Sequence, residues 1–196
     1  LCNVVLHDGD NRRKSWAHAQ QLVCGSDEVA AARLELEAGV DEPAWVARVL
    51  HEPVVFVDVV PSPTQSARNA AEADVVATLV AALEKRGVPL TDMAVLTPFR
   101  AQLRQLGRIL PAPVELSTVD RFQGKDAPCV IVSFARADAS TGLLADARRL
   151  NVALSRARRK LILVGARAAL AAASPLFARL AAAVPVVEAG ETPSPP

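Results

Sequence analysis

From residue 53 onward, short apolar runs alternate with longer segments in which apolar residues recur at helical spacing. The apolar runs predict buried strands, because a strand covered on both faces is hydrophobic along most of its length. The longer segments predict helices, because each has one apolar stripe. The expected strands are 53–60, 93–96, 114–117, 129–134 and 160–164, with an edge strand at 185–187. The expected helices are 69–86, 99–110, 147–157, 167–173 and 175–183.

This alternation predicts an α/β fold in which a parallel sheet is covered by helices on both faces. Ligands in such sheets bind in the loops at the carboxyl ends of the strands. We therefore expect the functional residues at that edge. The candidate segments are the loops 97–100, 117–126 and 135–141, and the turns around the helix that contains Arg148.

The two ends of the chain have weaker patterns. Residues 1–52 show no clean period, apart from one or two helical turns at 45–50, and are expected to form a partly irregular segment leading into a domain at 53–188. Residues 189–196 are rich in proline, and we expect a disordered tail. The chain begins without Met and without a helix start signal, which predicts a piece of a longer polypeptide.

An apolar fraction of 51% in 196 residues is enough for one sizeable core, built mainly from Ala, Val and Leu because only 4% of residues are aromatic. No run is long enough to span a membrane and no signal peptide is evident, so no membrane partner is expected. The cysteines Cys2, Cys24 and Cys129 lack metal-binding spacing. They predict a reducing compartment and no metal site.

Positive charge is concentrated in one stretch, although the chain as a whole has a net charge of only +1. Six basic residues and no acidic residue lie between Arg148 and Lys160. Guanidinium groups match phosphate oxygens bidentately and stay charged, so this stretch suits a phosphate-containing ligand. The alternative is a solvated helix face. The apolar stripe of Leu150 and Leu154, with Arg149 and Arg156 two turns apart, argues partly against that alternative.

Polar residues also follow the expected strand 93–96. Thr97, Pro98, Phe99 and Arg100 precede or open a helix, where a hydroxyl and free backbone N–H groups can bind an anion. Ordinary capping, with Thr97 as N-cap and Pro98 in the first turn, explains these residues equally well when they are considered alone. Arg100 then begins a ridge of arginines at every fourth position, which suits either solvent or nucleic acid.

The segment 117–126 is dense in short polar residues. Ser117 and Thr118 end the expected strand, and Gly124 permits close backbone approach to a ligand. Gln123 and Asp126 could order a water, a ribose or a metal, or could cap a turn. No single residue here decides between these roles.

The sequence contains no Walker A loop, so it has no phosphate cradle of its own. An arginine that faces a neighbouring nucleotide site can neutralise charge on the γ-phosphoryl group, an effect worth about 10³–10⁵ in rate. An arginine finger in this chain would therefore require a second domain that holds the nucleotide.

Three sequence blocks resemble one family when they are taken together. They are TPFRAQ at 97–102, STVDRFQGKD at 117–126 followed by VIVSFAR, and LLADARRLNVALSRARRKLILVG at 143–165. They resemble the second RecA-like motor domain of superfamily 1 helicases of the 5′-to-3′ branch, a P-loop NTPase-type fold. The similarity covers about 53–180. It is closest to the eukaryotic DNA replication helicase/nucleases, because Asp126 stands where the RNA-helicase relatives usually carry Glu.

The resemblance implies roles for individual residues. Arg156 would be the catalytic arginine finger. The implied nucleotide-binding residues are Gln123, Gly124, Asp126, Arg149 and Arg156. The implied DNA-binding residues are Thr97, Pro98, Phe99, Arg100, Ser117, Thr118 and Arg136. Phe99 departs from the family, in which Tyr is common at this position.

The resemblance also implies cofactors and partners. ATP and Mg²⁺ would be bound mainly by a first motor domain outside this chain, and an iron–sulfur cluster would lie only in a nuclease domain further upstream. The expected partners are single-stranded DNA, the first RecA-like domain and a single-stranded-DNA-binding protein. The expected location is the nucleus, with mitochondria as a second site.

Three alternatives remain open. An RNA helicase of the nonsense-mediated-decay type would carry similar motifs, because these contact the nucleic-acid backbone rather than the base edges. A non-catalytic interaction module is the second alternative, although Gln123, Asp126 and Arg156 are intact. A small α/β phosphate-binding enzyme that acts alone is the third, although the chain has no P-loop or nucleophile signature.

Overall fold

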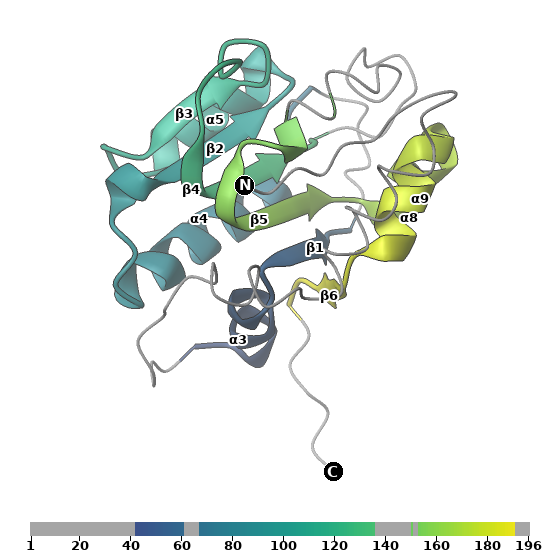
Figure 1. Ribbon diagram of the computed structural model, residues 1–196, viewed down its shortest axis with the longest axis horizontal. Helices are drawn as coiled ribbons and strands as arrows, with labels where there is room; N and C mark the ends of the chain where they lie inside the picture. The colour runs from purple at the N-terminus through teal and green to yellow at the C-terminus, as the bar shows by residue number, and fades with distance from the viewer. Residues whose placement is uncertain (1–41, 61–66, 136–149, 151–152, 191–196) are drawn as a thin grey trace.

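The computed structural model describes residues 42–60, 67–135, 150 and 153–190, and every structural statement below concerns these residues. Six strands form one parallel sheet in the order β3-β2-β4-β5-β1-β6 (Figure 1). The parallel α/β sheet predicted from the sequence is confirmed. The strands are β1 Val54–Asp58, β2 Met93–Thr97, β3 Glu115–Thr118, β4 Ala127–Ser133, β5 Ala157–Gly165 and β6 Val186–Glu188.

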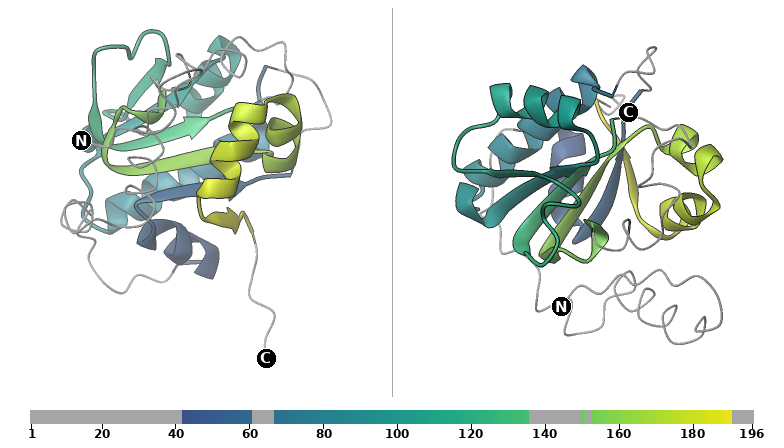
Figure 2. Two further views of the ribbon diagram at one scale, coloured as in Figure 1. Left: turned by 45° about the vertical axis from the view of Figure 1, so that its right-hand side comes forward. Right: turned by 90° about the horizontal axis from the view of Figure 1, so that it is seen from above.

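Helices cover both faces of this sheet (Figure 2). One face is covered by α3 (Ala44–His51), α4 (Ala70–Lys85) and α5 (Arg100–Ile109). The other is covered by α8 (Arg167–Ala173) and α9 (Pro175–Ala183). A short 3-10 helix, η1 (Leu90–Asp92), leads into β2. No helix among the described residues is long and apolar enough to cross a membrane.

Alternate strand residues face the two helical layers, as the pleat of a strand requires. Phe56 of β1 packs towards α9, where its ring meets Phe177 edge-on at 5.8 Å between centroids. Phe134, just after β4, meets the same ring at 5.0 Å. On the other face, Val55 belongs to the cluster that contains Leu79 of α4. The two clusters fix the sheet between its helices and make its edges rigid platforms.

Two strands, β4 and β5, begin earlier than the apolar runs predict. β5 starts at Ala157, whereas the sequence predicts a strand only from residue 160 and a helix up to 157. Arg158 and Arg159 are the second and third residues of β5. Both are exposed, because this end of the strand extends beyond the core at the amino edge of the sheet. Hydrophobicity therefore gave no signal there. Residues 153 and 154 are helical, and Arg156 lies in the turn before β5.

Candidate nucleotide and nucleic-acid interfaces

The carboxyl edge of the sheet brings together two of the predicted polar segments. Thr97 ends β2 and Thr118 ends β3, and the two residues are partners in the register of these parallel strands. Arg100 is exposed at the first position of α5, and Thr118 is half-buried. Ser117 is buried next to Thr118. Because β2 and β3 are neighbours in register, Thr118 and the exposed start of α5 lie at the same edge of the sheet. Arg136 lies outside the described residues.

Thr97 differs from its neighbours because it is fully buried. Its hydroxyl oxygen accepts a hydrogen bond from the Phe99 N–H at 3.3 Å. The N-cap of α5 is Phe99, which makes no side-chain cap, so the expected arrangement with Thr97 as N-cap and Pro98 in the first turn is wrong. Pro98 and Phe99 therefore lie in a turn between the end of β2 at Thr97 and the start of α5 at Arg100. Thr97 shapes this turn rather than facing solvent.

The second group of predicted residues lies at the amino edge. Gln123, Gly124 and Asp126 precede β4 directly and are exposed. Arg156 precedes β5, and its Nη1 donates to the carbonyl oxygen of Lys125 at 3.1 Å. The backbone is joined here as well, because the Ala127 N–H donates to the carbonyl oxygen of Arg156 at 3.0 Å. Arg156 is thus held beside the segment that it was predicted to approach.

A second arginine contacts the same segment. Arg158 donates a hydrogen bond to the Asp126 carboxylate. This bond, and the charges of Arg158 and Arg156, lower the pKa of Asp126 below its ordinary value. Gly124 has a φ of +86°, in the left-handed region that favours glycine, and a Cβ there would meet no atom within 4 Å. This edge is therefore exposed, and the ionised carboxylate of Asp126 is held beside Arg158 and Arg156.

The predicted position of this group at the carboxyl edge is wrong. The β4 and β5 strands are parallel, with Ala127 opposite Ala157, so residues directly before them lie at the amino edge. The loop 119–126 starts at the carboxyl end of β3 and finishes at the amino end of β4, so it crosses the sheet. Sequence reasoning assigned the whole loop to the edge where it begins. Arg149 lies outside the described residues.

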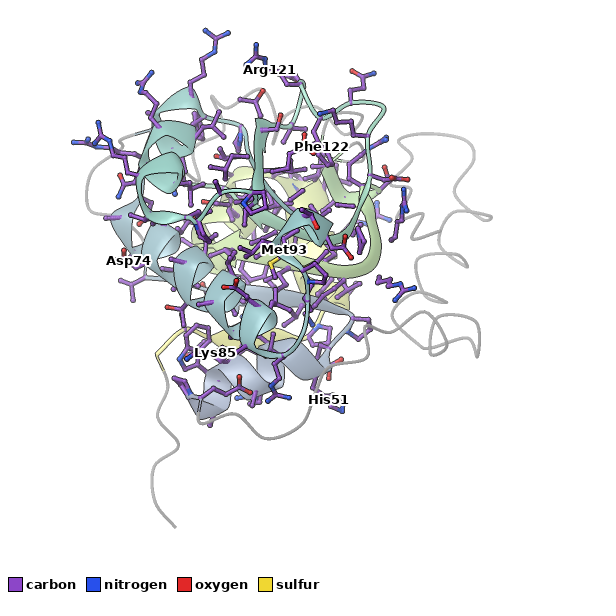
Figure 3. All side chains as sticks on the ribbon, turned by 90° about the vertical axis from the view of Figure 1, so that its left-hand side faces the viewer. His51, Asp74, Lys85, Met93, Arg121 and Phe122 are labelled. Atoms are coloured by element: carbon purple, nitrogen blue, oxygen red, sulfur yellow. The ribbon has the colours of Figure 1, made fainter. Side chains whose placement is uncertain are left out.

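The crossing segment is packed against the sheet. Val119 and Phe122 are buried in the same cluster as Leu96 and Val130. Figure 3 shows Phe122 turned inward and its neighbour Arg121 at the surface. The eight residues 119–126 therefore join the two edges of the sheet, and the buried side chains of Val119 and Phe122 hold this segment against the core.

The structure also shows polar residues that the sequence analysis did not assign to a site. Glu72 of α4 is buried at the carboxyl edge, where Oε2 accepts from the Ser133 hydroxyl and the Ala135 N–H, both at 2.8 Å. Burial raises the pKa of Glu72 to about 7, although these hydrogen bonds lower it. Lys160 of β5 is buried as well. Neither residue belongs to an apolar pattern that would have drawn attention to it.

The described residues contain neither a reactive cysteine nor a group of side chains that could bind a metal ion. Cys129 is fully buried in β4, and burial raises the pKa of its thiol to about 12, so it is a small apolar residue here rather than a nucleophile. Among the described residues, no group of three or more His, Cys, Asp or Glu side chains could hold a metal ion.

Comparison with known proteins identifies the family. A family model described as an AAA domain matches residues 13–168. The chain belongs to this family. Three of its curated relatives are named DNA replication ATP-dependent helicase/nuclease. JHS1 of Arabidopsis thaliana is 38% identical over 165 residues, which cover 76% of this chain and 12% of that protein.

The other two relatives are DNA2 proteins. DNA2 of Mus musculus is 39% identical over 186 residues, covering 81% of this chain and 18% of that protein. DNA2 of Saccharomyces cerevisiae is 33% identical over 194 residues, covering 85% and 12%. A solved structure, the C-terminal domain of a possible DNA helicase from Lactobacillus plantarum, aligns over 76% of this chain and 99% of that chain, with a TM-score of 0.46 and 18% identity.

The family model and the three relatives confirm the resemblance to the helicase/nucleases and, with the parallel sheet, the RecA-like fold class. The chain is a helicase-family domain related to ATP-dependent enzymes of DNA replication. It spans between 12% and 18% of the length of the three relatives.

Proposed function

We propose that this chain is the second motor domain of an ATP-dependent 5′-to-3′ DNA helicase/nuclease that acts on single-stranded DNA in replication and repair. It contributes an arginine finger at one edge of its sheet and part of the DNA track at the other. The observation that carries the proposal is the position of Arg156, which lies beside Lys125 and Asp126 in a chain without a Walker A loop.

The amino edge suits a nucleotide held by a neighbouring domain. Arg156 is half-buried and donates to a backbone carbonyl oxygen, a partner that a phosphate oxygen can replace with a stronger, charge-assisted bond. Exposed Gln123 and Gly124 lie beside it and can contact the same phosphate or its attacking water. ATP with Mg²⁺, bound mainly by the first RecA-like domain, supplies the phosphoryl group that is transferred to water. Arg156 then stabilises the negative charge that develops on the γ-phosphoryl oxygens.

The carboxyl edge suits the sugar-phosphate backbone of a single strand. Thr118, Arg100 and the first turn of α5 present a hydroxyl, a guanidinium and backbone N–H groups on one surface. Such groups position phosphates without reading bases, as a translocating motor requires. Ser117, Pro98 and Phe99 support this surface, and buried Thr97 shapes the turn between them. Arg136 is proposed to extend it.

The segment 119–126 couples the two edges in this proposal. It begins next to the DNA-contacting Thr118 and ends at Asp126 beside the arginine finger. Val119 and Phe122 anchor it in the core, so a displacement at one end is transmitted by packed side chains. The names of the relatives favour DNA over RNA as the polymer. A nuclear location and a single-stranded-DNA-binding protein among the partners belong to the same proposal.

The test is the Arg156→Ala variant of the full-length protein. Nucleotide affinity should stay within a few-fold of the parent, whereas single-turnover hydrolysis should fall by about 10²-fold or more, because a finger acts on the transition state. Arg48→Ala, which removes an exposed arginine from α3, is the matched control and should hydrolyse at the parental rate. Parental hydrolysis in a folded Arg156→Ala variant would remove the finger role from this residue.

A further inference from the structure

A closed hydrogen-bond network at the carboxyl edge joins α4, α5 and β4. Its members besides Glu72 are Asn69, Gln102 and Ser133, all buried, and the backbone of Ala135. The Gln102 side chain binds both backbone groups of Asn69: Oε1 accepts from its N–H at 2.8 Å, and Nε2 donates to its carbonyl oxygen at 3.1 Å. Nε2 also donates to the Ser133 hydroxyl at 3.0 Å. The amide of Gln102 therefore has all its hydrogens in use.

Three of the donors in this network point at the Glu72 carboxylate. Because the Ser133 hydroxyl accepts from Gln102, its single hydrogen points to Glu72 Oε2. The Ala135 N–H donates to the same oxygen, and Asn69 Nδ2 donates to Oε1 at 3.2 Å. Three donors thus meet one carboxylate and no acceptor faces it among these contacts. These bonds are strongest when Glu72 is ionised, since its oxygens then accept with charge assistance, and a proton on the carboxyl would have no acceptor among these contacts.

No cation balances this carboxylate in the described surroundings. The groups that face Glu72 are the neutral polar groups of Asn69 from α4, of Gln102 from α5 and of Ser133 and the backbone from β4. Arg68, which precedes α4, Asp74 of α4 and Arg100 of α5 are charged residues close to the network in sequence, and all three are exposed. The influences on the pKa of Glu72 are burial, which raises it to about 7, and hydrogen bonds, which lower it. Its charge therefore depends on pH near neutrality.

The bond from Ala135 to Glu72 holds an unusual piece of backbone. Ala135 has a φ of +58°, in the left-handed region that a residue with a Cβ rarely adopts. Through Gln102, the same network fixes the first turn of α5, which begins at Arg100. The end of β4 and the start of α5 are therefore set relative to one another by the Glu72 carboxylate.

We propose that Glu72 is a positioning residue for the DNA-contacting edge, and that its ionisation keeps the end of β4 and the start of α5 in the arrangement that binds single-stranded DNA. The inference rests on the proposed function and adds a pH dependence to it. When Glu72 is neutral, the bonds from Ser133 and Ala135 lose their charge assistance and the edge loosens.

The experiment compares the full-length parent with Glu72→Gln, with Glu84→Gln on the exposed face of α4 as the matched control. Affinity for a fluorescent oligothymidine strand is measured at fixed salt at about pH 6 and about pH 8. The parent and the Glu84→Gln control should have equal DNA affinity at each of the two pH values. Glu72→Gln should bind several-fold more weakly than the control at the higher pH and approach it at the lower pH. Hydrogen exchange of the Ala135 amide should be faster in Glu72→Gln at the higher pH, without DNA.

The outcomes separate the two claims. If the parent and the control bind no single-stranded DNA at either pH, the proposed function fails. If both bind, and Glu72→Gln has the same affinity, the same pH profile and the same Ala135 protection, then the DNA-binding function stands and the role of Glu72 is overturned.

Discussion

The ammonium nitrogen of Lys160 lies 2.6 Å from the carbonyl oxygen of Glu52, a residue 108 positions earlier in the chain. It also donates to the carbonyl oxygens of Val49 and Leu50, each at 2.9 Å. Because α3 ends at His51, these carbonyl groups lack partners within the helix and carry partial negative charge. A buried lysine of β5 therefore caps α3 and fixes this helix on the sheet.

Replacing Lys160 with Met keeps much of the side-chain volume but removes the three charged donors. We expect the free energy of unfolding to fall by about 3 kcal/mol, because hydrogen bonds to a charged group are lost and buried carbonyl oxygens are left without it. Arg159→Met, at the exposed neighbouring position, is the control and should change stability by about 0.5 kcal/mol or less. Urea unfolding followed by circular dichroism measures both. Equal losses in the two variants would show that the cap contributes little.

The buried carboxyl of Glu72 predicts a free energy of unfolding that falls as pH rises, because the cost of burying the charge exceeds the gain from the hydrogen bonds that the ionised carboxylate strengthens at the carboxyl edge. Burial raises the pKa of Glu72 from 4.5 to about 7 in the folded state. Between these values the folded protein binds a proton that the unfolded chain does not, so this contribution is full below about pH 4.5 and is lost as pH rises through about 7. At about 1.4 kcal/mol per pKa unit, it amounts to roughly 3 kcal/mol.

The measurement is the free energy of unfolding from urea titrations at about pH 5.5 and about pH 8, for the parent and for Glu72→Gln. The parent should lose stability between the two conditions relative to Glu72→Gln, whose side chain cannot ionise. Parallel pH profiles for the two proteins would mean that Glu72 does not titrate in this range.

The sequence was sufficient for the parallel sheet because every central strand is apolar on both faces. β2 and β4 are interior strands, and their runs of Val, Ile and Leu fall within the predicted ranges 93–96 and 129–134. The start of β5 could not be predicted in this way, because Arg158 and Arg159 are exposed and interrupt the apolar signal. Strand ends beyond the core are set by neighbouring backbones rather than by hydrophobicity.

The candidate sites were predicted as residues but not as a geometry. The sequence identified Gln123, Asp126 and Arg156, and the structure brings Arg156 and Asp126 together. The sequence prediction placed these residues at the carboxyl edge, which is wrong, because a loop between parallel strands starts at one edge of the sheet and finishes at the other. Glu72 was not identified as a site residue from the sequence, since its partners Ser133 and Ala135 are 61 and 63 positions away. Periodicity carries no information about such contacts.

The isolated 196-residue chain should hydrolyse no ATP, with or without DNA. Arg156 can stabilise a transition state only when another domain presents the nucleotide, and no Walker A loop is present in the sequence. Phosphate release by the purified chain measures this, with the full-length protein as the positive control. Mg²⁺-dependent turnover that survives re-purification and is lost in Arg156→Ala would contradict the architecture proposed here.

The two threonines at the carboxyl edge should respond differently to loss of their hydroxyl groups. Thr118 is half-buried at the proposed DNA surface, so Thr118→Val in the full-length protein should weaken single-strand binding by about 1–3 kcal/mol, the usual loss for a hydrogen bond to a charged group. The loss should be similar for mixed-base and homopolymer strands, because a backbone contact reads no sequence. DNA-stimulated hydrolysis should fall, whereas the DNA-free rate should stay near the parental value.

Thr97→Val is the matched variant, because Thr97 is the register partner of Thr118 but is fully buried and accepts from the Phe99 N–H. Losing that acceptor should lower the free energy of unfolding by about 1 kcal/mol. Its DNA affinity, measured at matched salt on folded protein, should fall less than that of Thr118→Val. If the two variants lose equal affinity, the hydroxyl of Thr118 acts through the fold rather than on a phosphate. A loss confined to one base composition would indicate base readout, and a sequence-independent track at this edge would then be wrong.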